Sequence, residues 1–156
     1  MATGNYITDK VQTALVAFLA TKTFTNIVSA SIYKGVQRTP ASVATAIDEQ
    51  ASPRVECVCQ RATRETVAPI DGNWVAVASV EITSNADDTA EDNHHLNSAE
   101  VLSHLVTDSI ALDLSSALAD FTAFSVYALD QSWEITGRSW VSKIGLEIHC
   151  CGSDIS

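Results

Sequence analysis

The chain has 156 residues, of which 46% are hydrophobic, and its nineteen acidic and nine basic side chains give a formal net charge of −10. A chain of this length is typical of one domain that buries a core without disulfides or metal, so we expect residues 1–156 to form a single domain. The charge argues against a DNA- or RNA-binding protein, because such proteins normally present a basic surface to phosphate.

The same composition sets expectations about location. No apolar run reaches the ~18 residues of a membrane span, and the N-terminal MATGNYITDK lacks the basic and apolar regions of a secretory signal. The four cysteines occur as a C-x-C and a C-C pair. Without a signal they indicate reduced thiols in a cytoplasm, and no membrane association is expected.

The first predicted element is an amphipathic helix over residues 8–20, with Thr8 as its candidate N-cap. A short edge strand is expected within residues 27–33. Residues 35–53 are bounded by Gly and Pro and show no strong apolar stripe. We expect a long loop or arm there, either a surface loop or a docking arm for a neighbour.

Two strands follow, and the second of them organises the fold. Residues 53–61 (PRVECVCQR) place Val55, Cys57 and Cys59 on one face. Residues 74–84 (WVAVASVEITS) alternate in the same way, with one face apolar throughout. The sequence Asp-Gly-Asn just before the second strand predicts a turn, so the two strands are expected to pair antiparallel.

A second main helix is expected after the acidic stretch NADDTAEDNHH. Asn97 is its candidate N-cap, and Glu100 follows three residues later in a capping-box pattern. One apolar stripe then runs from Val101 to Leu112. Residues 113–120 predict only a short extra turn.

A closing pair of strands is expected at residues 122–129 (TAFSVYAL) and 138–150 (RSWVSKIGLEIHC), joined by DQSWEITG as a connecting loop. The element order is then α-β-β-α-β-β. It predicts an α+β fold, a mostly antiparallel four-stranded sheet with two main helices packed on one face.

The usual motifs of catalytic, cofactor and metal sites are missing from the sequence, which favours a protein that is not an enzyme and holds neither cofactor nor metal. The acidic stretch lacks the alternating carboxylates and the glycine of a Ca²⁺ loop. Neither cysteine pair has the spacing of zinc ligands, so Cys57 and Cys59 are expected to pack as small buried hydrophobes. No nucleophile elbow, P-loop or dinucleotide fingerprint occurs, and His104 is interpreted as an edge-of-core residue.

The remaining polar and aromatic features are interpreted as candidate interface residues. Trp133, in the predicted connecting loop, is either an exposed interface anchor or packed back on the sheet. Charged side chains of the predicted loops complete the set, which comprises Arg38, Asp87, Asp88, Glu91, Asp92, His95, Trp133 and Arg138.

Four segments together carry a resemblance to a known protein family. They are the N-terminal helix, the Pro-led strand PRVECVCQR, the apolar strand that ends in S-N-A-D-D before a His and a helix, and the closing F-S-V-Y…G-R-S-W…L-E-I-H-C hairpin. In this order they resemble the tail terminator (tail completion, head–tail joining) proteins of tailed bacteriophages. The resemblance spans roughly residues 8–150, apart from the 35–53 segment.

The resemblance implies a structural virion protein of the tail or neck, made in the host cytoplasm, that forms a homohexameric ring. Such a ring caps the head-proximal end of the tail tube, stops tube polymerisation and joins the tail to the neck or head. Its partners would be further copies of the chain, the tail tube protein, and neck, connector or portal-adaptor proteins. DNA would pass through the lumen without specific binding, which the net negative charge suits.

Two alternatives stay open at this point. In the same class, the chain could be a neck or head–tail connector subunit. From another class, it could be a small cytoplasmic enzyme or ligand-binding α+β domain, with a closed pocket that uses His94, His95 and His104.

Overall fold

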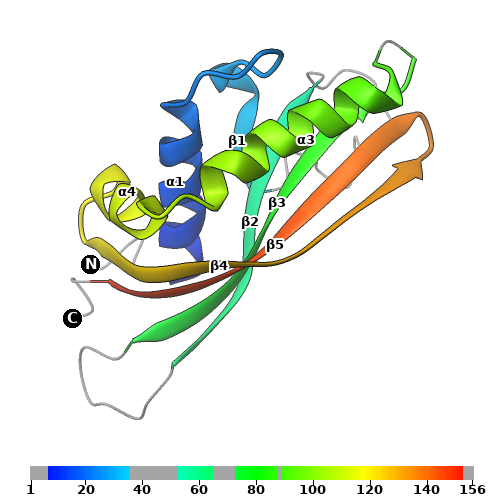
Figure 1. The fold of residues 1–156 in the computed structure, drawn as a ribbon. Helices are drawn as coiled ribbons and strands as arrows, with labels where there is room; N and C mark the ends of the chain where they lie inside the picture. The colour runs from blue at the N-terminus through cyan, green and yellow to red at the C-terminus, as the bar shows by residue number, and fades with distance from the viewer. Residues whose placement is uncertain (1–6, 36–52, 65–72, 88, 153–156) are drawn as a thin grey trace.

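The computed structural model describes residues 7–35, 53–64, 73–87 and 89–152. Within these ranges, three α-helices lie on one face of a five-stranded sheet (Figure 1). The elements in chain order are α1 (Ile7–Ala20), a 3-10 turn (Ser29–Ser31), β1 (Ile32–Lys34), β2 (Arg54–Arg64), β3 (Trp74–Asn85), α3 (Glu91–Leu105), α4 (Ile110–Ala117), β4 (Phe121–Thr136) and β5 (Ser139–Gly152). None of these helices is long and apolar enough to cross a membrane.

The strand order in the sheet is β1-β2-β3-β5-β4. β2 pairs antiparallel with β3, β3 with β5, and β5 with β4, so both predicted hairpins are present. β1 pairs with β2 in parallel, with Ile32 opposite Val55. The predicted Asp-Gly-Asn turn and the predicted 35–53 arm fall mostly outside the described residues.

The predicted fold class was therefore wrong in two respects. The sheet has five strands and is mixed, and three helices cover it. β1 has only three residues, too few to show an alternation, and its parallel pairing requires a crossover that local patterns do not reveal. The apolar stripe that predicted one helix is divided between two, because α3 ends at Leu105 and Ile110 begins α4.

The predicted start of the second helix was also wrong. α3 begins at Glu91, after Ala90, and Asn97 lies buried in its middle. Asn97 Oδ1 accepts a hydrogen bond of 3.0 Å from Asn26 Nδ2. Glu100 accepts bonds from the backbone N–H of Thr25 at 3.2 Å and from its Oγ1 at 2.8 Å. The apparent capping box therefore ties α3 to the segment after α1.

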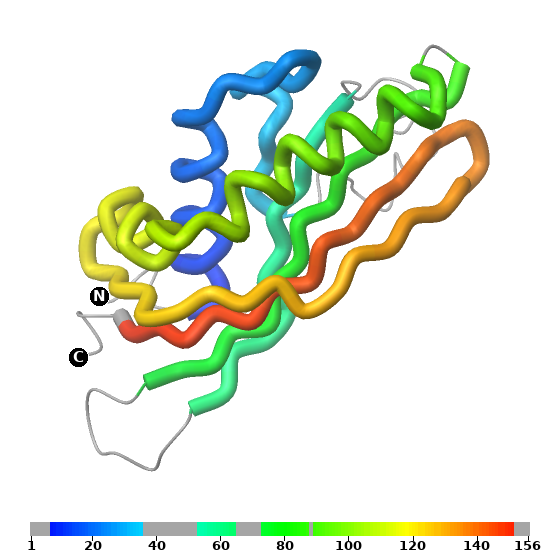
Figure 2. The backbone as a smooth tube through the Cα atoms, in the orientation of Figure 1, coloured from blue at the N-terminus to red at the C-terminus, as the bar shows by residue number. Residues whose placement is uncertain are grey.

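The third predicted strand is longer than expected. β4 continues to Thr136, so most of the DQSWEITG segment is strand and not a connecting loop. The chain reverses at Gly137, whose φ of +60° is a conformation that glycine adopts without strain. The β4–β5 hairpin therefore runs beside β3 to the end of that strand, where Asn85 is opposite Ser139 (Figure 2).

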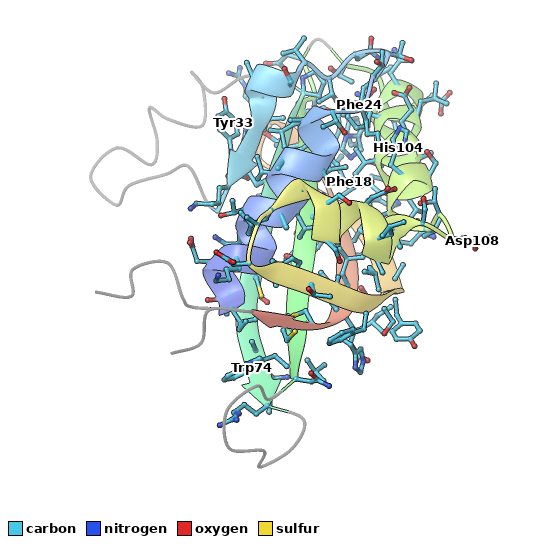
Figure 3. All side chains as sticks on the ribbon, turned by 90° about the vertical axis from the view of Figure 1, so that its left-hand side faces the viewer. Phe18, Phe24, Tyr33, Trp74, His104 and Asp108 are labelled. Atoms are coloured by element: carbon cyan, nitrogen blue, oxygen red, sulfur yellow. The ribbon has the colours of Figure 1, made fainter. Side chains whose placement is uncertain are left out.

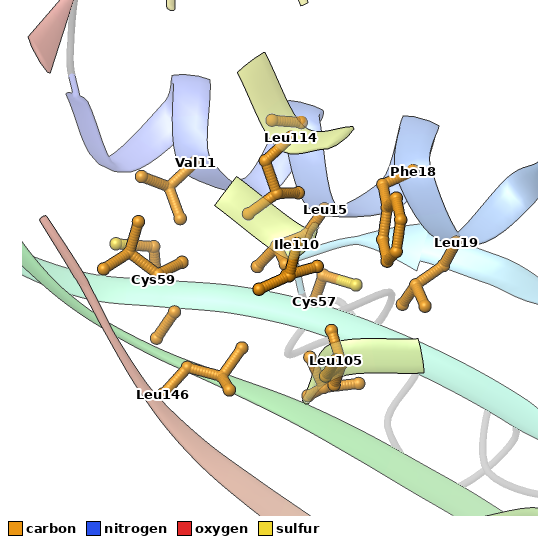
Figure 4. Close-up of a cluster of buried hydrophobic side chains, with 14 of the residues drawn as sticks. Val11, Leu15, Phe18, Leu19, Cys57, Cys59, Leu105, Ile110, Leu114 and Leu146 are labelled. Atoms are coloured by element: carbon orange, nitrogen blue, oxygen red, sulfur yellow. The ribbon is translucent and has the colours of Figure 1, made fainter. Parts of the chain in front are cut away.

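The core lies between the sheet and the helices, and Figure 4 shows its centre. The predicted alternation of β3 is confirmed, since Ala76, Ala78, Val80 and Ile82 are all buried on the helix side. The core side chains labelled in the figure are Val11, Leu15, Phe18, Leu19, Cys57, Cys59, Leu105, Ile110, Leu114 and Leu146.

The prediction that Cys57 and Cys59 pack as small hydrophobes is confirmed, because both side chains are buried in this core. Burial raises the pKa of the Cys57 thiol to about 12, with a further contribution from neighbouring Glu56. Burial likewise raises the pKa of Cys59 to about 11. Both are neutral thiols at pH 7 and lie on β2 beneath α1 rather than at the surface (Figure 4).

Candidate functional site

The most distinctive surface of the molecule is strand β4, which forms one edge of the sheet. Among the described residues its only strand partner is β5. Five large apolar side chains on it are 46–57% exposed, namely Phe124, Tyr127, Leu129, Trp133 and Ile135. The strand has no Lys, Arg or Pro, the residues that usually protect a sheet edge. An edge of this length and composition is typical of a surface that an assembly covers.

The apolar side chains of β4 point to both faces of the sheet. Tyr127 is in register with Glu147, on the face away from the helices, whereas Trp133 is in register with buried Ser142 on the helix side. Register shifts beside Phe124 and Leu129 mark bulges, which turn the strand between these two sections. One partner wrapping the edge would contact both sets.

Two hollows lie between β4 and the helices. The first is lined by α3 and by the outer half of the hairpin, including His95, Leu102, Gln131 and Trp133. The second lies between the α3–α4 connection and residues 124–128 of β4. Together they join the exposed surface of β4 to the neighbouring side of α3 and to the α3–α4 connection.

Aromatic rings gather where the β4–β5 hairpin meets the start of α3. The Trp133 ring lies edge-on to His95, with 4.9 Å between ring centroids, and 5.9 Å from Trp140. Trp140 Nε1 donates a hydrogen bond of 2.8 Å to the carbonyl of Thr89. Trp133 therefore packs back on the molecule with one side of its ring, and 46% of the residue stays exposed.

His94 is the buried centre of this region. Its Nδ1 lies 3.0 Å from Ser84 Oγ on β3, and its Nε2 lies 2.7 Å from Ser142 Oγ on β5. Burial, with a smaller contribution from His95, lowers the pKa of His94 to about 4, so the ring is neutral at pH 7. A buried imidazole with both nitrogens engaged holds α3 on the sheet and offers nothing to a substrate.

Several of the predicted interface residues are brought together at this end of the molecule. Arg138 Nε lies 3.6 Å from Asp87 Oδ2, and the Arg138 carbonyl accepts a 2.7 Å bond from the N–H of Ala86. His95 Nε2 lies 3.4 Å from Glu91 Oε2. The acidic turn, the start of α3 and the hairpin turn thus form one surface.

The outcome for the other predicted residues differs. Asp92 is exposed in the first turn of α3, beside this surface. Arg38 and Asp88 lie outside the described residues. Sequence reasoning missed four exposed apolar residues of β4, namely Phe124, Tyr127, Leu129 and Ile135. The available signal was that the predicted strand at residues 122–129 carries large apolar side chains on both faces.

The histidines of the enzyme alternative do not converge on one pocket. His104 packs edge-on to Phe24, with centroids 5.3 Å apart, near the other end of α3 (Figure 3). Ten residues of helix separate it from His94, which is roughly 15 Å. Among the described residues, no group of His, Cys, Asp and Glu is placed to hold a metal ion.

Comparisons with known proteins give a likeness of fold. No protein-family model and no curated protein sequence matches the chain. Among solved structures, the fold is similar to a chain described as "Virion of native gene transfer agent (GTA) particle", with a TM-score of 0.65 and 12% sequence identity. The alignment covers 94% of this chain and 99% of that chain, so the likeness of fold runs along nearly the full length of both.

Proposed function

We propose that the chain is a structural virion protein, and specifically a tail terminator. In this role its copies form a ring at the head-proximal end of a tail tube, stop tube polymerisation and join the tail to the neck. The observation that carries the proposal is the end-to-end fold likeness to a virion chain. The resemblance of the sequence pattern to tail terminators supports the finer assignment.

The surfaces of the molecule suit such a role. Strand β4 offers a long apolar edge for a neighbouring protein, and the hairpin end offers mixed charges and an aromatic ring from Asp87, Glu91, His95, Trp133 and Arg138. We propose that these surfaces contact further copies, the tube protein or the neck. A net charge of −10 favours a lumen through which DNA moves without binding.

The buried state of His94 argues against the enzyme alternative. An essential base must reach its substrate, whereas His94 is fully buried and both its nitrogens contact serine hydroxyls. The polar groups around the hollows along β4 are spread over α3, the α3–α4 connection, β4 and β5 and do not converge on one point. This arrangement suits protein contacts better than a closed pocket.

Deletion of the gene in the virus that encodes the chain tests the proposal. A terminator stops tube growth, so particles made without it are expected to have tails longer than those of the wild type and no attached heads in electron micrographs. A plasmid copy should restore tail length, and the same plasmid with a frameshift should not. Tails of normal length that lack heads would instead indicate a connector, and unchanged particles would contradict both roles.

A further inference from the structure

We propose that neighbouring subunits join through the two opposite edges of the sheet. The outer edge of β4 in one copy pairs antiparallel with the last residues of β2 in the next copy, and the sheet continues from subunit to subunit. The inference deepens the proposed function, because it takes the partner of β4 to be a second copy of this chain.

The first step concerns the charges of β4. Its only charged side chains are Asp130 and Glu134, and both are exposed. Two β4 strands paired with one another would therefore bring carboxylates together with no cation between them, which disfavours a symmetric β4–β4 contact. Because of these two carboxylates, a partner strand that carries positive charge would bind the β4 edge better than a second β4 would.

The opposite edge of the sheet supplies that charge. β1 covers β2 only along Val55–Cys57, and the side chain of Gln12 accepts a 2.9 Å bond from the N–H of Cys59. Beyond this point, in the described residues, the final stretch of β2 pairs with β3 alone. It carries Arg61 and Arg64, both exposed, and no acidic residue. These are two of only nine basic residues in the chain.

The direction of the strands fits a continued sheet. Three antiparallel steps lead from β2 through β3 and β5 to β4, so a second copy in the same orientation presents its β2 antiparallel to β4. Arg61 is in register with Val77 and, through it, with Glu147. Asp130 and Glu134 are in register with Gly145 and Val141. Since these β5 residues alternate on one face, Arg61 lies on the same side of the sheet as Asp130 and Glu134. Arg64 is in register with Trp74 and, through it, with buried Cys150, so it lies on the helix side and adds positive charge only along the edge itself.

The positions of the two edges favour a ring. Figure 2 shows the β2–β3 end and the β4–β5 hairpin projecting in opposite directions from the body of the molecule. A contact between two different edges is heterologous, and such contacts generate closed rings or open filaments. If the sheet continues from one subunit to the next in this way, the helices of all subunits lie on the same face of the continuous sheet.

Charge reversal on the purified full-length chain tests this contact, with native mass across concentration as the measurement. The acidic edge is reversed in Asp130→Lys/Glu134→Lys, and the basic edge in Arg61→Glu/Arg64→Glu. Each variant alone should raise the concentration for half-assembly at least about tenfold, because like charges then face each other. A 1:1 mixture should regain the wild-type mass, since every contact in it again joins opposite charges.

Control variants separate an effect at the two edges from an effect of net charge or of misfolding. Asp113→Lys changes the net charge by two, at a residue of α4 outside both edges and both hollows along β4, and should assemble as the wild type does. Arg61→Glu alone checks the basic edge without disturbing Arg64, which lies 5.8 Å from the centre of the Trp74 ring. Circular dichroism and thermal melting confirm that each variant is folded.

Three results with the wild type, the edge variants and their mixture would overturn the inference. They are a wild-type chain that stays monomeric up to its solubility limit, edge variants that assemble normally, and a mixture that remains dissociated. Dissociation of the Asp113→Lys control would assign the effect to net charge and would overturn the inference too. The deletion phenotype is read from tail length, so a failure of this contact can be told from a failure of the terminator role.

Discussion

His94 connects α3 to two strands through its two ring nitrogens, and its charge therefore affects stability. Its pKa in the fold is about 4, below the ordinary value of 6.5. Between these values the unfolded chain binds more protons than the folded one, so the free energy of unfolding falls as the pH drops through this window and levels off below it. One pKa unit corresponds to about 1.4 kcal/mol, so the loss is at most roughly 3 kcal/mol.

Urea unfolding of the wild type and of His94→Gln at several pH values between 7 and 4 measures this effect. The variant should be less stable at pH 7, and the difference between the two proteins should shrink as the pH falls. Carboxylates titrate in both proteins and cancel in that difference. Two curves that run parallel over the whole range would show that His94 does not contribute the pH dependence.

The cysteines give a second prediction at this scale. All four lie in the described residues, and none forms a disulfide. Cys57, Cys59 and Cys150 are buried, whereas Cys151 is partly exposed. Since the thiolate is the reactive form, iodoacetamide at pH 8 should modify Cys151 alone on the time scale of minutes, and all four in urea. Intact mass counts the modified sites, and a rapid second modification of the native chain would contradict the burial of the other three.

At the scale of elements, the sequence was informative where the buried side chains are apolar and the exposed ones are polar. α1, β2 and β3 place apolar side chains at helical or alternating spacing, and those side chains are the ones that the core buries. α3 breaks that rule, because His94 and Asn97 are polar and buried. Their partners are Ser142 and Asn26, which are distant in sequence, and Ser84 on the preceding strand, so no pattern within the helix itself could place its start.

Strand β4 shows the opposite difficulty. Its outer half is exposed on both faces, so the DQSWEITG segment has no alternation to detect. Pairing with β5 makes it a strand, and the register from Gln131 opposite Ile144 to Thr136 opposite Ser139 is unbroken. The candidate site was therefore only partly predictable. Trp133 and the acidic turn could be selected by residue type, but their convergence depends on the length of this hairpin.

At the scale of the whole molecule, the hairpin end and the sheet edge meet at Trp133. Part of its ring already packs on His95 and Trp140, and the remainder is exposed on the strand that we propose to pair with a second copy. Leu112 on α4 is 68% exposed but belongs to neither surface. Substitutions of Trp133 and Leu112 can therefore distinguish a residue of the assembly contact from an exposed apolar residue outside it.

Trp133→Ala should weaken assembly more than it weakens the fold. Truncating a buried aromatic anchor of an interface typically costs about 2 kcal/mol or more, which corresponds to a rise of more than roughly tenfold in the concentration for half-assembly. Within the monomer the loss is smaller, because Trp133 is already half exposed, and the melting temperature measured under dissociating conditions should fall by only a few degrees. Leu112→Ala should change neither quantity appreciably. Equal effects of the two variants on native mass would mean that the hairpin end stays in solvent in the assembly, and the sheet-edge contact would then have to form without it.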